Sequence, residues 1–271
     1  MRVYEIPEGS KTSKGRALVN LINLEQDDKV KAFLVTEDLK NEEYVNGHYI
    51  IMATKKGQVK KTSLEQYSRP RTNGINAITI KEDDELLEAK LTTGDSQVML
   101  ALKSGKSIRF EESKTRPMGR NASGVRGISL ANEKDEVVGM IAVNDLESNI
   151  LVVSENGYGK RSSLEDYRIT NRGGKGVKTI NVTEKTGNLV AIKNVTDEDD
   201  LMIINKSGIT IRMAVSDLRV MGRATQGVKL INIRDNDSIA AVAKVMHEEE
   251  VEVEENGTEI ENNSNESTNK E

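Results

Sequence analysis

The sequence repeats one unit of about 50 residues, and this repeat restricts the possible folds more than any other feature. Four apolar runs each lead into a short polar turn that ends in glycine, and successive glycines are 48, 52 and 51 residues apart. A glycine at this place supplies the positive φ that a tight β-hairpin requires. The turn glycines are Gly57, Gly105, Gly157 and Gly208.

The rest of the unit is repeated as well. The turn is followed by a second strand with a basic residue four places beyond the glycine, a loop that ends in a second glycine, a third strand, an acidic turn and an apolar fourth strand. Four strands rich in β-branched residues at this period are typical of a propeller blade. We therefore predict an all-β propeller of four-stranded blades over residues 1–246, with about five blades detectable. The second glycines are Gly15, Gly74, Gly124, Gly176 and Gly227, the third strands follow them, and the fourth strands are expected at 30–35, 86–91, 137–143, 189–195 and 239–245.

The first unit is incomplete. Residues 1–36 supply a loop and the third and fourth strands but no initial hairpin, so we expect the chain to be a fragment of a longer protein. The long spacing before Gly74 predicts a polar loop inserted near residues 37–46. The one helical signal is a turn at residues 63–67, which is repeated at 163–167.

Charge is distributed unevenly along the chain. The segment 248–271 contains ten Glu and one Lys, so its net charge is −9. Because the whole chain has a net charge of −5, the remainder has a net charge of +4. Because this segment has few apolar and no aromatic residues, we expect residues 247–271 to form a disordered acidic tail. A mildly basic body with an acidic tail fits a protein that binds a polyanion, with the tail competing for the same surface. A tail that serves solubility alone is the alternative.

Composition disfavours several classes of protein. The chain has no cysteine, and its two histidines, His48 and His247, are far apart, so neither a disulfide framework nor a zinc site is expected. There is no apolar run of about 20 residues and no secretory signal. Neither a Ser-His-Asp set nor paired carboxylates outside turns and the tail stand out. We therefore expect a cytoplasmic protein with no membrane partner, no metal, no cofactor and no catalytic residues in this chain.

Basic residues recur at equivalent positions of the units. Radial repetition places equivalent residues on a common ring, so these charges are expected to form a belt. A belt that neutralises phosphates binds duplex DNA without sequence preference, and its affinity falls steeply with salt. The chain has two Phe, six Tyr and no Trp, which argues against stacking on single-stranded bases. The predicted DNA contacts are Lys60, Lys61, Arg109, Lys160, Arg161 and Arg212 on second strands, Lys11, Lys14, Arg16, Arg69, Arg71, Arg116, Arg120, Arg172, Lys175 and Arg223 in loops, and Arg126, Lys178 and Lys229 just beyond the second glycines.

Five segments of the repeat have a recognisable sequence: Gly9 to Leu18, Gly57 to Thr62, Met118 to Ile128, Asn156 to Arg161 and Gly222 to Val228. Through these segments, from about residue 2 to residue 245, the chain resembles the C-terminal domain of bacterial DNA gyrase A, one of the two polypeptides of DNA gyrase. The resemblance implies a six-bladed β-pinwheel, a propeller in which neighbouring blades exchange strands, with duplex DNA wrapped around its basic rim to support negative supercoiling by a type IIA topoisomerase. It also implies two partners, the rest of gyrase A and the gyrase B polypeptide, which carry the DNA-cleaving and ATP-dependent chemistry with its ATP and Mg.

The chain departs from that family in two respects, the place of its box and the missing first blade. The family's Q-R-R-G-G-K-G box belongs to a first blade that would lie upstream of residue 1. The nearest segment here, Thr170 to Gly176, matches five of the seven residues but lies in a later blade, where we expect it to share in DNA contact. The missing blade leaves two alternatives open: whether the ring closes, and whether the chain wraps DNA or only bends it.

Two other functions compete with this interpretation. The equivalent C-terminal domain of topoisomerase IV also binds and bends DNA, and the long acidic tail and even repeats favour gyrase over it. A protein-interaction propeller of the WD40 or kelch kind would carry Trp-Asp or paired-glycine signatures, and this chain has no Trp.

Overall fold

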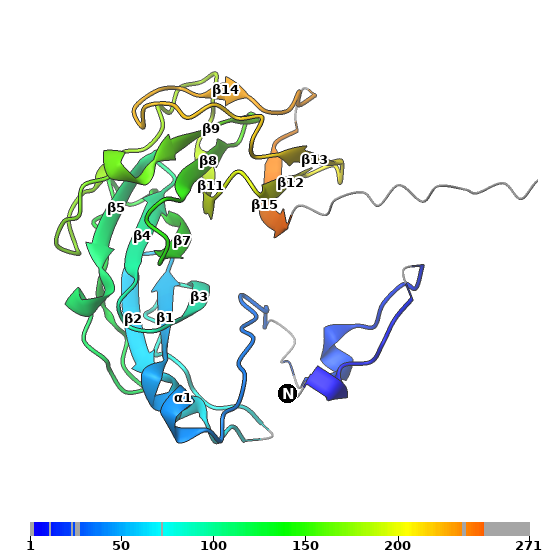
Figure 1. Cartoon of the computed structure of the whole chain (residues 1–271), viewed down its shortest axis with the longest axis vertical. Helices are drawn as coiled ribbons and strands as arrows, with labels where there is room; N and C mark the ends of the chain where they lie inside the picture. Colours follow the sequence, from blue (N-terminus) through cyan, green and yellow to red (C-terminus); the bar gives the residue numbers. More distant parts are fainter. Residues whose placement is uncertain are drawn as a thin grey trace, which may run out of the picture.

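The computed structural model describes residues 3–10, 12–22, 24, 28–71, 73–234 and 237–246. Within this part of the chain, four antiparallel sheets follow one another along an open arc (Figure 1). The sequence-based prediction of an all-β fold of repeated blades is confirmed. The predicted acidic tail, residues 247–271, lies outside the described residues.

Each sheet is built on a hairpin whose turn ends in one of the repeated glycines. Gly57, for example, has φ +83° and joins β1 (Tyr49–Thr54) to β2 (Gln58–Ser63). The fourth strand of the repeat then pairs with the other side of the first strand, so β3 (Leu86–Thr92) lies beside β1. The later repeats contain β4 (Gln97–Leu102), β5 (Lys106–Glu111) and β7 (Val137–Val143), then β8 (Asn149–Ser154), β9 (Tyr158–Ser163) and β11 (Leu189–Val195), and finally β12 (Asp199–Asn205), β13 (Thr210–Ala214) and β15 (Ile239–Met246).

The third strand of a repeat does not join its own sheet. It is only two residues long and pairs with the second strand of the preceding repeat, as β6 (Val125–Arg126) does with β2. In the same way β10 (Val177–Lys178) pairs with β5 and β14 (Val228–Lys229) with β9. The strand exchange that the resemblance implied is therefore present, and each repeat completes the sheet of its predecessor.

Strand exchange between repeats determines which strands lie on the concave side of the arc and which on the convex side. The fourth strands β3, β7, β11 and β15 contact one another in series and line the concave side of the arc (Figure 1). The exchanged strands β6, β10 and β14 are at the opposite edge of their sheets and therefore lie along the convex side.

The hydrophobic core is divided between the interfaces of neighbouring sheets. One cluster joins the first sheet to the second and includes Ile51, Leu100 and Phe110, all fully buried. Equivalent clusters join the second sheet to the third and the third to the fourth. Because each cluster draws on two repeats, neighbouring repeats stabilise one another.

Some predicted elements are wrong. Residues 18–21 and 77–80 were predicted as third strands, but the first contains the 3-10 helix η2 (Leu18–Asn20) and the second forms no strand. Residues 30–35 likewise form no strand, since the described residues before them hold no hairpin to pair with. The insertion near 37–46 contains a short helix, α1 (Glu42–Gly47), begun by the Asn41 side chain, which accepts a 3.0 Å hydrogen bond from Tyr44 N.

The two helical turns expected after second strands are confirmed as the 3-10 helices η3 (Leu64–Tyr67) and η5 (Leu164–Asp166). Two more occur, η1 (Val3–Glu5) and η4 (Glu112–Lys114). No helix in the described ranges is long and apolar enough to cross a membrane.

Candidate nucleic-acid interface

Exposed cations lie on the outermost strand of three sheets. Arg126, Lys178 and Lys229 are each the second residue of an exchanged strand, and all three are exposed. Alternation along a strand explains this arrangement, since the preceding valine faces inward and the basic residue faces solvent. The three sequence-predicted positions are therefore brought onto one edge of the arc.

The loop before each exchanged strand carries two further arginines at fixed spacing. In the third repeat, Arg116 and Arg120 lie eight and four residues before Gly124, and the next two repeats keep this spacing. Prediction from sequence named Arg116, Arg120, Arg172 and Arg223 but missed Arg168 and Arg219, which are exposed equivalents of Arg116. The missed signal was the common distance from the loop glycine. The loop cations are Arg116 and Arg120, Arg168 and Arg172, and Arg219 and Arg223.

The inner arginine of each loop is held by the preceding repeat. Arg223 Nη1 donates a 2.8 Å hydrogen bond to the carbonyl of Lys178, and Arg172 Nη1 donates one of 3.0 Å to the carbonyl of Arg126. Arg120 makes a longer contact of 3.5 Å with the equivalent carbonyl of Asn76. Each acceptor belongs to the segment that follows a second glycine, so Arg172 and Arg223 are positioned beside the strand cations Arg126 and Lys178.

Two of the predicted contacts, Lys60 and Lys160, face inward instead. Lys160 is 1% exposed, and its Nζ donates to the carbonyl of Gly222 at 2.6 Å and to Thr225 Oγ1 at 3.1 Å. Lys60 is fully buried and donates to the carbonyls of Ala77 and Arg120. Each amine therefore donates from the protein interior to the backbone of an arginine-bearing loop. We remove both lysines from the set of proposed DNA contacts.

Burial changes the acidity of these two lysines. It lowers the pKa of Lys60 to about 8, and the charge of Arg120 contributes to this shift. It also lowers the pKa of Lys160 to about 8, with Asp166 opposing the shift and Arg223 adding to it. A buried ammonium loses hydration, so folding shifts the protonation equilibrium of both lysines toward the neutral amine.

The next position along the second strand is also buried. Lys61 Nζ lies 2.9 Å from Glu112 Oε1 and 4.1 Å from the centre of the Tyr49 ring. The equivalent Arg109 donates to the carbonyls of Leu164 and Tyr167 at 2.7 and 2.9 Å, and its burial lowers its pKa.

Arg161 completes this series by donating to the carbonyl of Leu218 and to Asp197. In each case the cation of one repeat holds the turn that follows the second strand of the next repeat. The prediction that Lys61, Arg109 and Arg161 lie on an exposed belt is thus corrected, because their charged groups are occupied by protein acceptors. Arg212, in the last repeat, is partly exposed and pairs with Asp200 at 2.7 Å.

The remaining predicted contacts are exposed side chains in loops. Arg69 and Arg71 lie in the shorter loop of the second repeat, and Lys175 lies beside Gly176. Lys14 and Arg16 lie in the first repeat, while Lys11 is outside the described residues. The segment Thr170 to Gly176, the nearest match to the gyrase box, therefore carries Arg172 and Lys175 in the loop that leads into β10.

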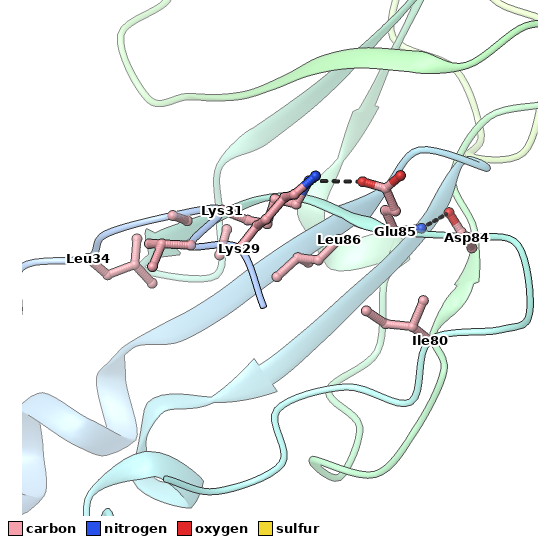
Figure 2. Close-up of a pocket in the computed structure, with 10 residues that line it drawn as sticks. Lys29, Lys31, Leu34, Ile80, Asp84, Glu85 and Leu86 are labelled. Carbon is pink, nitrogen blue, oxygen red and sulfur yellow. Dashed lines mark hydrogen bonds and ion pairs between the residues drawn. The ribbon is translucent and has the colours of Figure 1, made fainter. Parts of the chain in front are cut away.

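A groove of about 590 Å³ opens beside β3, between it and the extended segment of the first repeat (Figure 2). Leu34, Ile80 and Leu86 line it, and an ion pair of 2.9 Å between Lys31 and Glu85 crosses its rim. Within the described ranges, no group of three or more His, Asp or Glu residues is placed to hold a metal ion.

Sheets that exchange strands along an arc, with cations repeated on the convex edge, define the class of this protein as a propeller of the pinwheel type. The chain matches the family described as "DNA gyrase C-terminal domain, beta-propeller" over residues 1–37, 48–93, 98–144, 148–196 and 199–246, and it belongs to that family.

Relatives support this assignment. The DNA gyrase A polypeptide of Staphylococcus epidermidis is 46% identical over 251 residues, which are 92% of this chain and 28% of the relative. The gyrase A polypeptide of Staphylococcus aureus is 45% identical over 256 residues, covering 94% and 28%. The chain thus spans little more than a quarter of the length of these relatives.

Solved structures show the same fold. The C-terminal domain of DNA topoisomerase IV has a TM-score of 0.81 at 24% identity, over 90% of this chain and 74% of that one. The DNA gyrase A C-terminal domain has a TM-score of 0.77 at 24% identity, over 91% and 78%.

Proposed function

We propose that this chain binds duplex DNA along the convex edge of the arc and bends it without reading sequence. The proposal is carried by the repeated loop, in which arginines lie eight and four residues before the second glycine. An exposed cation on the exchanged strand follows that glycine. One repeat therefore presents three cations, and the next repeat presents three more at the equivalent place. A phosphate backbone is the polyanion that such a regular row fits.

Because the row of cations follows the convex edge of the arc, a duplex bound along it would be bent. Bending DNA over a site of 20–30 base pairs costs on the order of 1–6 kcal/mol, which many phosphate contacts together can offset. The convex edge offers such contacts over several repeats, and glycines in the loops allow close approach of backbone N–H groups to phosphate oxygens. Binding is therefore expected to weaken steeply with salt.

We further propose that the chain acts as the DNA-wrapping part of DNA gyrase A. With the rest of gyrase A and with gyrase B, it would supply the handed wrap that strand passage converts into negative supercoils in the cytoplasm. The cleavage chemistry, ATP and Mg are assigned to those partners, and this chain contributes binding and shape.

Topoisomerase IV provides the second candidate function, because its C-terminal domain has the TM-score of 0.81. That likeness at 24% identity concerns the fold. The relatives at 45% and 46% identity are gyrase A polypeptides, which favours the gyrase role.

The handed wrap can be tested by trapping it in a closed plasmid. A nicked plasmid is incubated with increasing amounts of the chain, sealed with ligase, freed of protein and resolved on two-dimensional gels. Topoisomers shifted toward positive linking number with increasing protein support wrapping, and an unshifted distribution at saturating protein contradicts it.

Bending without a handed wrap is distinguished by a second assay. Ligase-mediated circularisation of short duplexes, about one persistence length of 150 base pairs, accelerates when a protein bends them. Faster circularisation with an unshifted plasmid distribution would leave duplex bending as the function of the isolated chain.

A further inference from the structure

The third residue after the turn glycine differs between the first three sheets. It is Lys60 in the first sheet, Ile108 in the second and Lys160 in the third. All three side chains are buried, so this position belongs to the interior in every case. The second sheet forms with an aliphatic residue there, and the fold therefore does not require an ammonium group at this place. Burying an ammonium group is unfavourable unless hydrogen bonds compensate for it, so the two lysines need a role other than packing.

The ammonium group of Lys160 is bonded to the backbone beside an arginine of the candidate interface. Its Nζ donates to the Gly222 carbonyl at 2.6 Å and to Thr225 Oγ1 at 3.1 Å. The Thr225 hydroxyl donates in turn to the Gly222 carbonyl at 2.9 Å. These three groups form a closed set of hydrogen bonds, and Arg223 is the residue that follows Gly222 in the chain.

The equivalent link in the first sheet is more direct. Lys60 Nζ donates to the backbone carbonyl of Arg120, which has the same place in its loop as Arg223. The same amine donates to the carbonyl of Ala77, in the segment after the second glycine of the preceding repeat. Lys60 therefore fixes the main chain of an arginine to the repeat before it.

The loop over the second sheet is held in another way. The Ile108 side chain has no hydrogen-bond donor, and a cavity of about 260 Å³ is lined by Ile108 and by Gly174 of the loop. Ser129 of the preceding repeat holds this loop, because its Oγ donates to the Gly173 carbonyl at 2.7 Å and its N donates to the Gly174 carbonyl at 2.9 Å. The position of Arg172 therefore does not depend on a buried ammonium group.

We propose that Lys60 and Lys160 are positioning residues for DNA binding, a role that rests on the proposed function and concerns the same loops. Each lysine holds the main chain of an arginine from inside the protein, so that the guanidinium group meets a phosphate on the outside. Without Lys160, the Gly222 carbonyl keeps only its bonds from Thr225, and the main chain that carries Arg223 is held less firmly. Binding groups need to be held within about 0.5 Å of their productive place, so a displaced arginine binds phosphate less tightly.

A double-mutant cycle tests whether Lys160 acts through Arg223. The affinity of the chain for a DNA duplex is measured by fluorescence anisotropy. In the otherwise unmodified chain, Lys160→Met should weaken binding about three- to tenfold, as expected for the loss of one phosphate contact. In the Arg223→Ala background the same change should alter the affinity by less than about twofold, because the side chain that Lys160 positions is absent.

Two comparisons separate this effect from a general loss of structure. In the Arg172→Ala background, Lys160→Met should keep its full effect, since Arg172 belongs to the loop over the second sheet. Ile108→Met is the matched change at the equivalent position, and it should leave the affinity unchanged because it removes no bond to a loop. Circular dichroism under the binding conditions checks that each variant is folded.

Thr225→Val provides a second variant in which the buried charge is intact. Thr225 is exposed, and the change removes the hydroxyl that links Lys160 Nζ to the Gly222 carbonyl. We expect weaker DNA binding than in the unmodified chain, by a smaller factor than for Lys160→Met. This loss should also disappear in the Arg223→Ala background.

Hydrogen exchange measures the positioning without DNA. The Thr225 amide donates to the Gly222 carbonyl at 3.2 Å, and it should exchange about fivefold faster in Lys160→Met than in the unmodified chain. The Gly173 amide, in the loop over the second sheet, should exchange at the same rate in both proteins. An unchanged rate for Thr225 would contradict the proposal.

The binding results distinguish failure of this proposal from failure of the DNA interface. Equal losses from Lys160→Met in the unmodified and Arg223→Ala backgrounds would show that the lysine acts by its charge alone. No loss in the unmodified chain would show that it does not act on binding, and either result overturns the proposal. If Arg223→Ala itself binds DNA as tightly as the unmodified chain, the proposed interface is contradicted, and the positioning role with it.

Discussion

Arg223 Nη1 donates a 2.8 Å hydrogen bond to the backbone carbonyl of Lys178, so a loop of one repeat is fixed to the exchanged strand of the repeat before it. The Lys178 side chain is itself exposed on that strand. The bond therefore sets the distance between two cations that come from different repeats. A row of charges with such fixed spacing suits a polymer of regularly spaced phosphates.

Removing the strand cations should weaken DNA binding without unfolding the protein. We expect the triple variant Arg126→Ala/Lys178→Ala/Lys229→Ala to bind a duplex of about 40 base pairs more weakly, and to lower the slope of log K against log salt by about 2.7, since each lost phosphate contact contributes about 0.9. Fluorescence anisotropy at several salt concentrations measures both quantities.

The matched control removes the same number of charges elsewhere. Lys56, Lys134 and Lys206 are exposed residues of turns outside the arginine-bearing loops. Their triple alanine variant changes the net charge equally, so the same loss of slope in both variants would contradict a localised DNA interface.

Replacing Lys160 by Met should produce a pH-dependent loss of stability. At pH 7 the variant loses the 2.6 Å hydrogen bond from Lys160 Nζ to the Gly222 carbonyl, which keeps its bonds from Thr225, at a cost of about 1 kcal/mol after the relief of burying a charge. The folded pKa of Lys160, about 8, lies below the ordinary 10.5, so the unfolded chain binds more protons between these values. Stability contributed by Lys160 therefore rises as the pH increases from about 8 to 10.5.

Urea unfolding of both proteins at several pH values from about 7 to 10 measures this effect. Because the other lysines titrate alike in the two proteins, the difference between their free energies of unfolding isolates residue 160. A difference that stays constant over this range would show that the pKa of Lys160 is not lowered.

Alanine at a loop glycine should be more costly where a neighbouring repeat is close. Gly124 and Gly74 have φ of +85° and +76°, which costs an L-residue about 1–2 kcal/mol at either position. Only at Gly124 would the new Cβ lie 2.5 Å from the carbonyl of Val59, and such crowding adds about 1–3 kcal/mol. Thermal unfolding should therefore place Gly124→Ala clearly below Gly74→Ala, and equal midpoints would contradict the exchanged pairing.

The buried ion pair between Lys61 and Glu112 should be sensitive to the loss of one partner. Glu112 is fully buried, so Glu112→Gln leaves the Lys61 charge uncompensated and is expected to lower the free energy of unfolding by about 3–5 kcal/mol. Removing both charges in Lys61→Met/Glu112→Leu should cost less than the single change. Additive losses in urea unfolding would show that the two groups are not coupled.

The repeat in the sequence predicted most of the fold. All four hairpins and the fourth strands after them lie where alternation, glycine and turn spacing placed them, because these signals are local. Strand exchange was implied by the resemblance alone. A pair of residues such as Val125 and Arg126 looks the same in sequence whether it joins its own sheet or the preceding one.

The candidate interface was predicted less well. Lys60 and Arg126 are both basic residues on strands, and periodicity cannot show that the first faces a carbonyl of the next repeat, that of Arg120, while the second faces solvent. The difference arises from contacts between repeats. Arg168 could have been found from sequence, since it lies eight residues before Gly176 just as Arg116 does before Gly124.

Because every complete sheet borrows its outermost strand from the following repeat, the unit that unfolds is larger than the repeat. Opening the third repeat removes β6 from the first sheet and deprives β10 of its partner β5, so neighbouring sheets lose hydrogen bonds together. Tension applied along the convex edge, such as that of a bent duplex, is therefore shared between adjacent sheets. The resistance of the arc to deformation is therefore set by the hydrogen bonds between neighbouring repeats rather than by the stability of any one sheet.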